Sequence, residues 1–185
     1  MASEVWASDR DQMMERGFVQ VYTGDGKGKT TAALGAAVRA AGHGLSTYFG
    51  QFMKGQSYGE GEALRGHPLI TMEQYGGTRC LRREEVTAED VARAERGLER
   101  ARDAMTSGLY QIVVLDELNV ALWFGLLSTE TVLELMDRRL PHVELILTGR
   151  RAPAEIMERA DLVTEMRQVK HYYDQGVPAR DGIER

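Results

Sequence analysis

One stretch of the sequence combines the residue types that bind phosphate groups, Thr-Gly-Asp-Gly-Lys-Gly-Lys-Thr-Thr from Thr23 to Thr31. Its glycines allow backbone N–H groups to turn toward phosphate oxygens, because no Cβ restricts the backbone there. Lys29 is expected to reach a phosphate as a positive charge, and the Thr30 hydroxyl is expected to hold Mg²⁺. The residues predicted to bind nucleotide phosphate are Thr23, Gly24, Asp25, Gly26, Lys27, Gly28, Lys29, Thr30 and Thr31.

This stretch needs a strand before it and a helix after it. The run Phe18–Tyr22 is typical of a strand, and the Ala-rich segment Ala32–Ala41 is typical of a helix stopped by Gly42. A strand, a glycine-rich turn and a helix form the context of a phosphate loop, and the positive end of the helix adds to the attraction. The alternative is a surface turn rich in glycine and lysine. One departure is that Thr23 occupies the place of the usual first glycine.

Two acids follow a second strand. Gln111–Leu115 is a continuous apolar run that suits a strand buried on both faces, and Asp116 and Glu117 come directly after it. An acid at a strand end can hold Mg²⁺ directly or through water. The alternative is an acid that caps the next helix. We predict Thr30, Asp116 and Glu117 as metal ligands, and Lys29 and Glu117 as the catalytic residues.

Other strand ends are expected to meet the same crevice, because ligands bind beyond the carboxyl ends of strands in an open parallel sheet. Gln51 and Lys54 end the run that begins at Leu45, and Arg150 follows the strand Val143–Leu147. Gln51 and Lys54 are predicted to contact the nucleotide, and Arg150 to reach phosphate oxygens or the ribose. A solvated side chain remains the alternative for both Lys54 and Arg150.

The whole chain alternates between strand and helix patterns. Predicted strands cover 18–22, 45–52, 69–74, 111–115, 143–147 and 161–166, and predicted helices cover 32–41, 87–106, 128–140 and 153–160. This alternation predicts a three-layer α/β domain with a mainly parallel sheet. The domain is expected to span residues 17–185, after an N-terminal arm of residues 1–16 that contains Trp6.

Composition and charge exclude several classes of function. The chain has 185 residues and a net charge of −5, so a broad basic surface for nucleic acid or anionic lipid is not expected. No apolar run approaches the roughly 20 residues that cross a bilayer, and the N-terminus has no secretory pattern. Its single cysteine, Cys80, excludes an internal disulfide. These features favour a cytoplasmic protein.

Five blocks in order resemble the ATP:corrinoid adenosyltransferases of the bacterial cobalamin pathway. They are Thr23–Thr31, Gln51–Gly55, Val113–Asn119, Leu147–Arg150 and Val169–His171. The threonine that opens the first block makes it more specific than a general Gly-Lys-Thr loop. The resemblance runs from about Gly17 to Ile183.

The resemblance implies a RecA-type fold of the P-loop NTPase class, with a sheet of about six strands and a homodimeric assembly. It implies transfer of the 5′-deoxyadenosyl group of ATP to Co(I) of cob(I)alamin or a precursor such as cob(I)yrinic acid a,c-diamide. Triphosphate then leaves as a unit, with the γ-phosphate deep in the loop. ATP, a reduced corrinoid, Mg²⁺ or Mn²⁺ and a flavoprotein reductase are the implied substrates, cofactor and partner.

The loop after the third predicted strand departs from the family pattern. The family places aromatic residues there to displace the lower ligand of cobalt, whereas this chain has Gly77 and Arg79. Either Tyr75 substitutes as a corrinoid contact, or the substrate lacks a bulky lower ligand. The arm 1–16 is expected to close over the corrinoid of the other subunit, with Trp6 as a contact.

Two other functions remain open from the residues alone. One is a P-loop ATPase or kinase that cleaves the β–γ bond, in which Glu117 orients a water molecule. The other is a regulatory or carrier protein that binds nucleotide and corrinoid without turnover. Identifying the group that leaves ATP would distinguish the first alternative from adenosyl transfer. Measuring the conversion of cob(I)alamin to its adenosyl form would distinguish the second.

Overall fold

The computed structural model describes residues 14–56, 58–79 and 81–184. The predictions for Trp6, for Cys80 and for most of the N-terminal arm lie outside these residues.

Six strands form one sheet in which every neighbouring pair is parallel, in the order β3-β2-β4-β5-β1-β6. The predicted α/β class and the six-stranded parallel sheet are therefore confirmed. The strands are β1 (Val19–Thr23), β2 (Thr47–Gln51), β3 (Ile70–Gln74), β4 (Ile112–Asp116), β5 (Glu144–Thr148) and β6 (Leu162–Glu165). Strand β4 is buried along its whole length, as its apolar sequence predicts.

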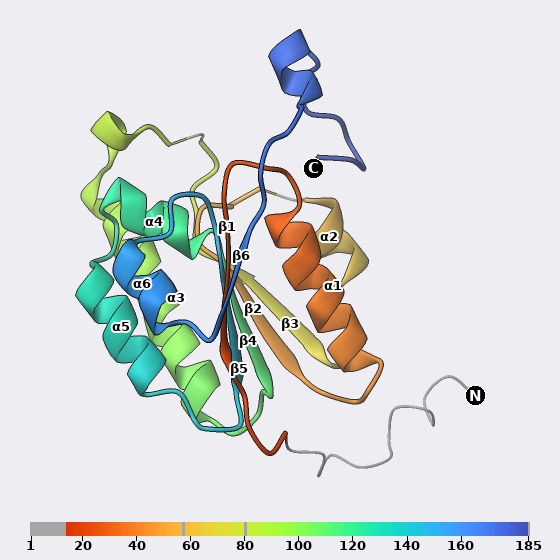
Figure 1. Ribbon diagram of the computed structural model, residues 1–185, viewed down its shortest axis with the longest axis vertical. Coiled ribbons are helices and arrows are strands. Elements are labelled where there is room, and N and C mark those ends of the chain that lie inside the picture. The colour runs from red at the N-terminus through yellow and green to blue at the C-terminus, as the bar shows by residue number, and fades with distance from the viewer. Residues whose placement is uncertain (1–13, 57, 80, 185) are drawn as a thin grey trace.

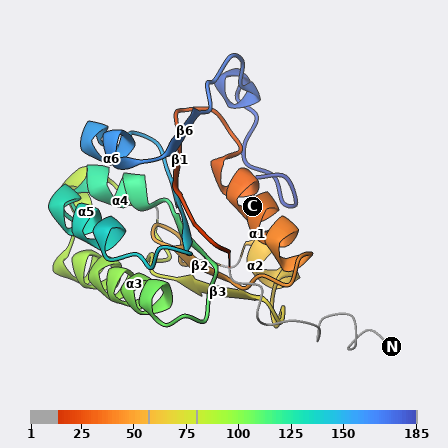
Figure 2. The ribbon, with the colours of Figure 1, turned by 60° about the horizontal axis from the view of Figure 1, so that its bottom comes forward.

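Helices cover both faces of the sheet, which gives three layers (Figures 1 and 2). On one face lie α1 (Lys29–Ala41) and the short α2 (Gly59–Ala63). On the other lie α3 (Ala88–Thr106), α4 (Leu118–Phe124), α5 (Thr129–Asp137) and α6 (Ala154–Arg159). Each face has its own apolar core, and the core on the side of α3 to α6 is the larger.

Helix α3 forms as its sequence predicts. The Thr87 hydroxyl accepts a hydrogen bond from the Asp90 N–H, and the Asp90 carboxylate accepts one from the Thr87 N–H, so the predicted capping box is present. Ala94, Leu98 and Ala101 are buried against the sheet. The charged residues between them cover the opposite face of this amphipathic helix.

Two helices lie where the sequence predicted none. Helix α2 occupies a segment expected to be a polar loop, and its five residues include two glycines, so no helical periodicity could reveal it. Helix α4 occupies the apolar run after Glu117, where nearly every side chain is apolar and the helical face is therefore not marked. Two single 3₁₀ turns, η1 (Arg83–Glu85) and η2 (Tyr172–Gln175), complete the secondary structure.

The connection from β1 through α1 to β2 passes over β4 and β5, because these two strands separate β1 from β2 in the sheet. The carboxyl ends of β1, β4 and β5 consequently meet at one edge, where a ligand crevice is expected. Strand β1, the first in the sequence, pairs only with β5 and β6, the last two. All four residues of β6 are exposed.

No helix within the described residues has the length and apolar character that crossing a membrane requires.

Candidate functional site

The phosphate loop joins β1 to α1 and lies against the chain that follows β6. The Gly26 N–H donates a 2.7 Å hydrogen bond to the Met166 carbonyl. A Cβ on Gly24 would lie 2.4 Å from that carbonyl oxygen, and Gly24 and Gly28 have positive φ angles of 92° and 116°. The glycines are therefore required by both the close approach of Met166 and the backbone conformation.

Lys29 is buried in the loop, with 6% of its surface exposed. Its ammonium donates hydrogen bonds of 2.8 Å to the Gly24 carbonyl and 2.7 Å to the Gly26 carbonyl. Burial lowers the pKa of Lys29, and the nearby carboxylate of Glu117 opposes that shift. The loop thus holds one cation at the base of the cavity, where an anionic ligand would meet it.

Asp116, at the end of β4, is fully buried and connects the phosphate loop to three other elements. One carboxylate oxygen accepts hydrogen bonds from the hydroxyls of Thr30 at 2.8 Å and Thr148 at 2.7 Å. The other accepts from the Gln51 amide at 3.1 Å and lies 3.2 Å from the Lys54 ammonium. All of these donors converge on one carboxylate, which fixes the relative positions of β2, β4, β5 and α1.

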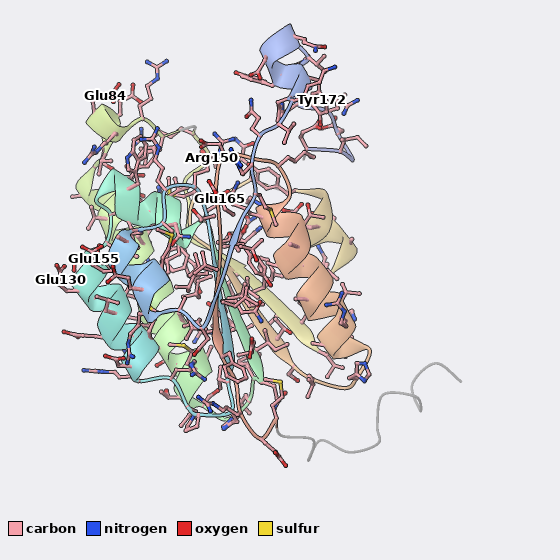
Figure 3. All side chains as sticks on the ribbon, in the orientation of Figure 1. Glu84, Glu130, Arg150, Glu155, Glu165 and Tyr172 are labelled. Atoms are coloured by element: carbon pink, nitrogen blue, oxygen red, sulfur yellow. The ribbon has the colours of Figure 1, made fainter. Side chains whose placement is uncertain are left out.

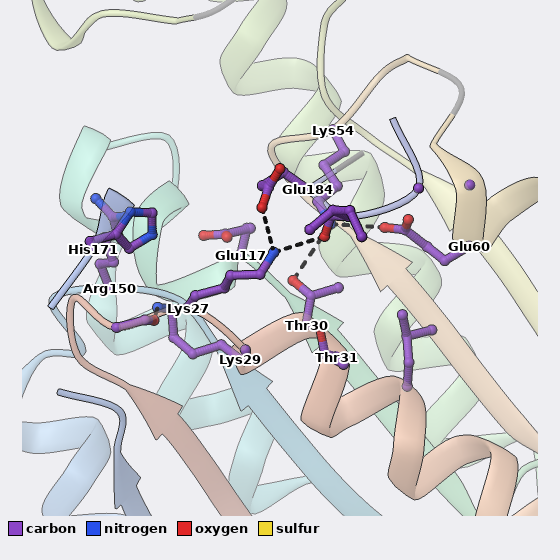
Figure 4. A pocket seen from close by; sticks show the side chains of 16 residues that line it. Lys27, Lys29, Thr30, Thr31, Lys54, Glu60, Glu117, Arg150, His171 and Glu184 are labelled. Atoms are coloured by element: carbon purple, nitrogen blue, oxygen red, sulfur yellow. Dashed lines mark hydrogen bonds and ion pairs between the residues drawn. The ribbon is translucent and has the colours of Figure 1, made fainter. Parts of the chain in front are cut away.

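Glu117 has a different environment from Asp116. Its backbone is left-handed, with φ 59°, and its N–H donates a 3.0 Å hydrogen bond to the Thr148 hydroxyl. This turn places its side chain at the cavity (Figure 4). Burial, reinforced by the charge of Asp116, raises the pKa of Glu117. A left-handed, non-glycine residue with a perturbed carboxylate in a cavity is typical of a functional position.

The Lys54 ammonium contacts two carboxylates, that of Glu60 in α2 at 3.1 Å and that of Asp116 at 3.2 Å. Burial lowers the pKa of Lys54, but these two carboxylates outweigh that effect and raise it. The Thr30 hydroxyl lies 3.5 Å from the same ammonium. Glu60 was not predicted from the sequence, because it lies in a helix that carries no sequence signal.

An open cavity of about 590 Å³ lies over the phosphate loop. Predicted residues from four separate segments line it, namely Gly26–Thr31, Lys54, Glu117 and Arg150 (Figure 4). Arg150 lies at the carboxyl edge of the sheet (Figure 3). Gln51 does not line this cavity; it is buried, and its amide donates a hydrogen bond to Asp116. The Thr23 hydroxyl accepts a 3.2 Å hydrogen bond from the Ala152 N–H.

The C-terminal segment also lines this cavity, through His171, Gly182, Ile183 and Glu184. The sequence predicts no strand or helix after residue 166 and does not indicate this contact. The segment leaves the sheet after β6, extends beyond its edge and returns toward α1 (Figures 1 and 2). No local pattern in the sequence indicates such a return.

Tyr75 lies apart from the phosphate cavity. Its hydroxyl is 2.6 Å from the Tyr48 hydroxyl and also donates a hydrogen bond to Glu73, while its ring packs on Phe52 with centroids 5.9 Å apart. It lines a small separate cavity with Gly77 and Arg79. The structure therefore does not bring Tyr75 together with the phosphate-binding residues.

The oxygen donors at the cavity suit Mg²⁺. Thr30 and Glu117 line the cavity with a hydroxyl and a carboxylate, and hard cations such as Mg²⁺ take oxygen ligands. Asp116, also predicted as a ligand, is fully buried and does not line the cavity. Within the described residues, no group of three or more His, Cys, Asp or Glu side chains could hold a metal ion. Few protein ligands are expected at such a site, since Mg²⁺ at nucleotide sites is bound largely by phosphate oxygens and water.

Gly149, which follows β5, tests how closely the backbone packs at the carboxyl edge of the sheet. Its φ is +130°, and a Cβ there would lie 3.0 Å from both the Asn119 Cβ and the Val120 nitrogen. Gly149→Ala is expected to lower the free energy of unfolding by about 1–3 kcal/mol in urea denaturation, because strain and crowding both oppose the methyl group. Gly35→Ala is the control, since a Cβ at that exposed position of α1 meets no atom within 4 Å. This control should be neutral or stabilising, and equal effects of the two substitutions would contradict the expectation.

Comparisons with known proteins identify a family to which the chain is similar. The sequence profile of the family described as ATP:corrinoid adenosyltransferase BtuR/CobO/CobP matches residues 15–185. The corrinoid adenosyltransferase CobA of Salmonella typhimurium is 39% identical over 173 residues, covering 92% of this chain and 86% of the relative. The corrinoid adenosyltransferase of Escherichia coli K12 is 38% identical with the same coverage.

Among solved structures, the KaiC-like protein PH0186 from Pyrococcus horikoshii is similar, with a TM-score of 0.52 and 16% sequence identity. The similarity covers 87% of this chain and 79% of that one. At this low identity, the likeness concerns the fold alone.

Proposed function

The chain belongs to the ATP:corrinoid adenosyltransferase family, and from that premise we propose how its cavity serves the transfer of an adenosyl group from ATP to a corrinoid. The observation that carries the proposal is the convergence of Lys29, Glu117 and Arg150 on one cavity over the phosphate loop. These side chains come from three separate strand ends, and their charges suit a polyphosphate and its cation.

The reaction joins the cobalt of the reduced corrinoid to C5′ of ATP. Co(I) supplies the electron pair, the new Co–C bond forms, and the bond between C5′ and the α-phosphate oxygen breaks. Triphosphate leaves with that bonding pair, and cobalt is formally oxidised to Co(III). Since the substrate itself is the nucleophile, the protein has to position C5′ and stabilise the charge of the leaving triphosphate.

We assign the protein groups accordingly. Lys29 and the loop amides bind the phosphate that lies deepest in the loop, and Arg150 approaches the polyphosphate from β5. Asp116 positions Thr30 and Lys54 rather than meeting the substrate, because all its partners are already supplied by the protein. Glu117, unlike Asp116, faces the cavity.

Thr30 and Glu117 would hold Mg²⁺ or Mn²⁺ together with phosphate oxygens. When bound, such a cation neutralises charge on the triphosphate. Asp116 would support this site through its hydrogen bond to Thr30.

The leaving group tests this function against a P-loop ATPase or kinase. The protein is incubated with ATP, Mg²⁺ and cob(I)alamin or cob(I)yrinic acid a,c-diamide under strong reductant, and both products are identified. Adenosylcorrinoid and triphosphate in equal amounts are expected. Orthophosphate without adenosylcorrinoid would instead support hydrolysis, and binding without turnover would support a carrier.

We also propose that the protein is a homodimer in the cytoplasm. A flavoprotein reductase would reduce its corrinoid substrate to the Co(I) state. The exposed edge strand β6 supports a partner, because Leu162 and Val163 each have 44% of their surface exposed in the single chain. We further propose Tyr75 as a corrinoid contact, in which case its small cavity has to open toward the crevice.

Glu117→Gln is expected to lower the turnover rate but raise the free energy of unfolding at mildly alkaline pH. The pKa of Glu117 is raised in the folded state, so its charged form opposes folding above that pKa. This penalty disappears as the pH falls below the unfolded value. The stability gain of the variant should therefore be largest at alkaline pH and vanish in acid.

Urea denaturation across the pH range and steady-state kinetics against Mg²⁺ concentration measure the two effects. Glu95→Gln, on the exposed face of α3, is the control and should change neither. An unchanged turnover rate and metal requirement would remove Glu117 from its proposed role.

A further inference from the structure

Residues 183 and 184 contact the phosphate loop directly. The Lys27 ammonium donates a 2.8 Å hydrogen bond to the Ile183 carbonyl and lies 3.5 Å from the Glu184 carboxylate (Figure 4). Lys27 belongs to the loop predicted to bind nucleotide phosphates, and Glu184 lines the same cavity. A carboxylate of the protein therefore lies at the site where a substrate anion is expected.

Glu184 is held there by several donors of its own segment. Its carboxylate accepts hydrogen bonds from the Tyr172 hydroxyl, from the Arg180 N–H at 2.9 Å and from the Arg180 guanidinium at 3.3 Å. The side chain is only 16% exposed. Hydrogen bonds from Arg180 and Tyr172 lower the pKa of Glu184 to about 2, so it remains charged at any pH near neutrality.

These donors are the kind that bind a phosphate group. Arginine matches the oxygens of carboxylates and phosphates equally well, a lysine ammonium binds either as a point charge, and a tyrosine hydroxyl donates to either. Lys27 and Arg180 carry two positive charges and Glu184 carries one negative charge, so the cluster keeps a net attraction for anions. The Arg180 guanidinium also lies over the Tyr172 ring, 4.9 Å from its centroid, which fixes its position.

We propose that Lys27, Arg180 and Tyr172 form a phosphate-binding subsite for the triphosphate of the substrate, and that Glu184 occupies this subsite in the free chain. Binding of the polyphosphate displaces the Glu184 carboxylate, and phosphate oxygens take its place beside Lys27, Arg180 and Tyr172. The subsite rests on the proposed function for the identity of its ligand, a triphosphate.

Glu184→Gln provides the first test, because glutamine keeps the shape of the side chain and removes the competing charge. Titration calorimetry with inorganic tripolyphosphate and with ATP should show binding at least about threefold tighter than in the wild type, as expected for loss of one partly exposed ion pair. Arg180→Met should weaken the binding of both ligands by a similar factor. Glu158→Gln, an exposed position on α6, is the control and should leave both affinities unchanged.

Hydrogen exchange of residues 181–184 gives an independent readout in the wild-type protein. Tripolyphosphate should speed exchange there, because Glu184 loses its contact with Lys27. Unchanged or weaker ligand binding by Glu184→Gln would overturn the proposal and leave Glu184 as a structural contact, and so would unchanged exchange with ligand bound. None of these measurements uses a corrinoid. They therefore test the subsite independently of the proposed adenosyl transfer, which is tested by identifying its products.

Discussion

Lys29→Ala is expected to lower kcat/KM for ATP by at least about 100-fold, comparable to the loss of one preorganised donor at a developing charge. The Lys29 ammonium is the buried cation of the phosphate loop, and in the free chain it is held by the Gly24 and Gly26 carbonyls. Alanine removes the charge and leaves both carbonyls facing the incoming phosphates. Titration calorimetry with ATP and steady-state adenosyl transfer measure the loss.

Arg96→Ala is the control for Lys29→Ala, since Arg96 is exposed on α3 and does not line the cavity. A thermal melt of both variants separates loss of binding from loss of folding. If Lys29→Ala binds ATP within about threefold of the wild-type affinity, the phosphate loop does not hold the nucleotide as proposed.

Asp116→Ala is expected to cost about 3–5 kcal/mol of unfolding free energy, the range found when one partner of a buried ion pair is removed. The substitution leaves the Lys54 ammonium with Glu60 as its remaining carboxylate and leaves the hydroxyls of Thr30 and Thr148 without their acceptor. Activity should fall as well, because Thr30 and Lys54 lose their common support. Urea denaturation followed by circular dichroism measures the stability.

Asp137→Ala removes an aspartate of the opposite kind, since its ion pair with Arg159 is exposed on both sides. This control should cost no more than about 1 kcal/mol. A similar loss in the two variants would show that burial does not decide the role of Asp116.

The phosphate loop and the sheet could be predicted from the sequence because both depend on local patterns. Buried parallel strands are short apolar runs, and a phosphate loop needs glycines at fixed places between a strand and a helix. The acids at the end of β4 could be found for the same reason, as they directly follow the most apolar strand. These rules also placed Lys54 and Arg150 at the correct edge of the sheet.

The pairing of side chains across the site could not be predicted, because it depends on the order of strands. Glu60 reaches Lys54 from a helix too short to show periodicity, and Thr148 reaches Asp116 only because β5 lies beside β4. The contact of Glu184 with Lys27 joins residues from the two halves of the chain. The hydroxyl of Tyr75 is engaged by Tyr48 and Glu73, and the corrinoid contact that the resemblance implies for Tyr75 stays a prediction.

The position of β1 affects how the molecule can form during its synthesis. Strand β1 pairs only with β5 and β6, and β6 ends at Glu165. Most of the chain must therefore be synthesised before β1 can pair with its neighbouring strands. Pairings so distant in sequence are slow to form, because a long loop must close first. A nascent chain whose synthesis stops before β5 should therefore not bind nucleotide stably, although the residues of its phosphate loop have already been synthesised.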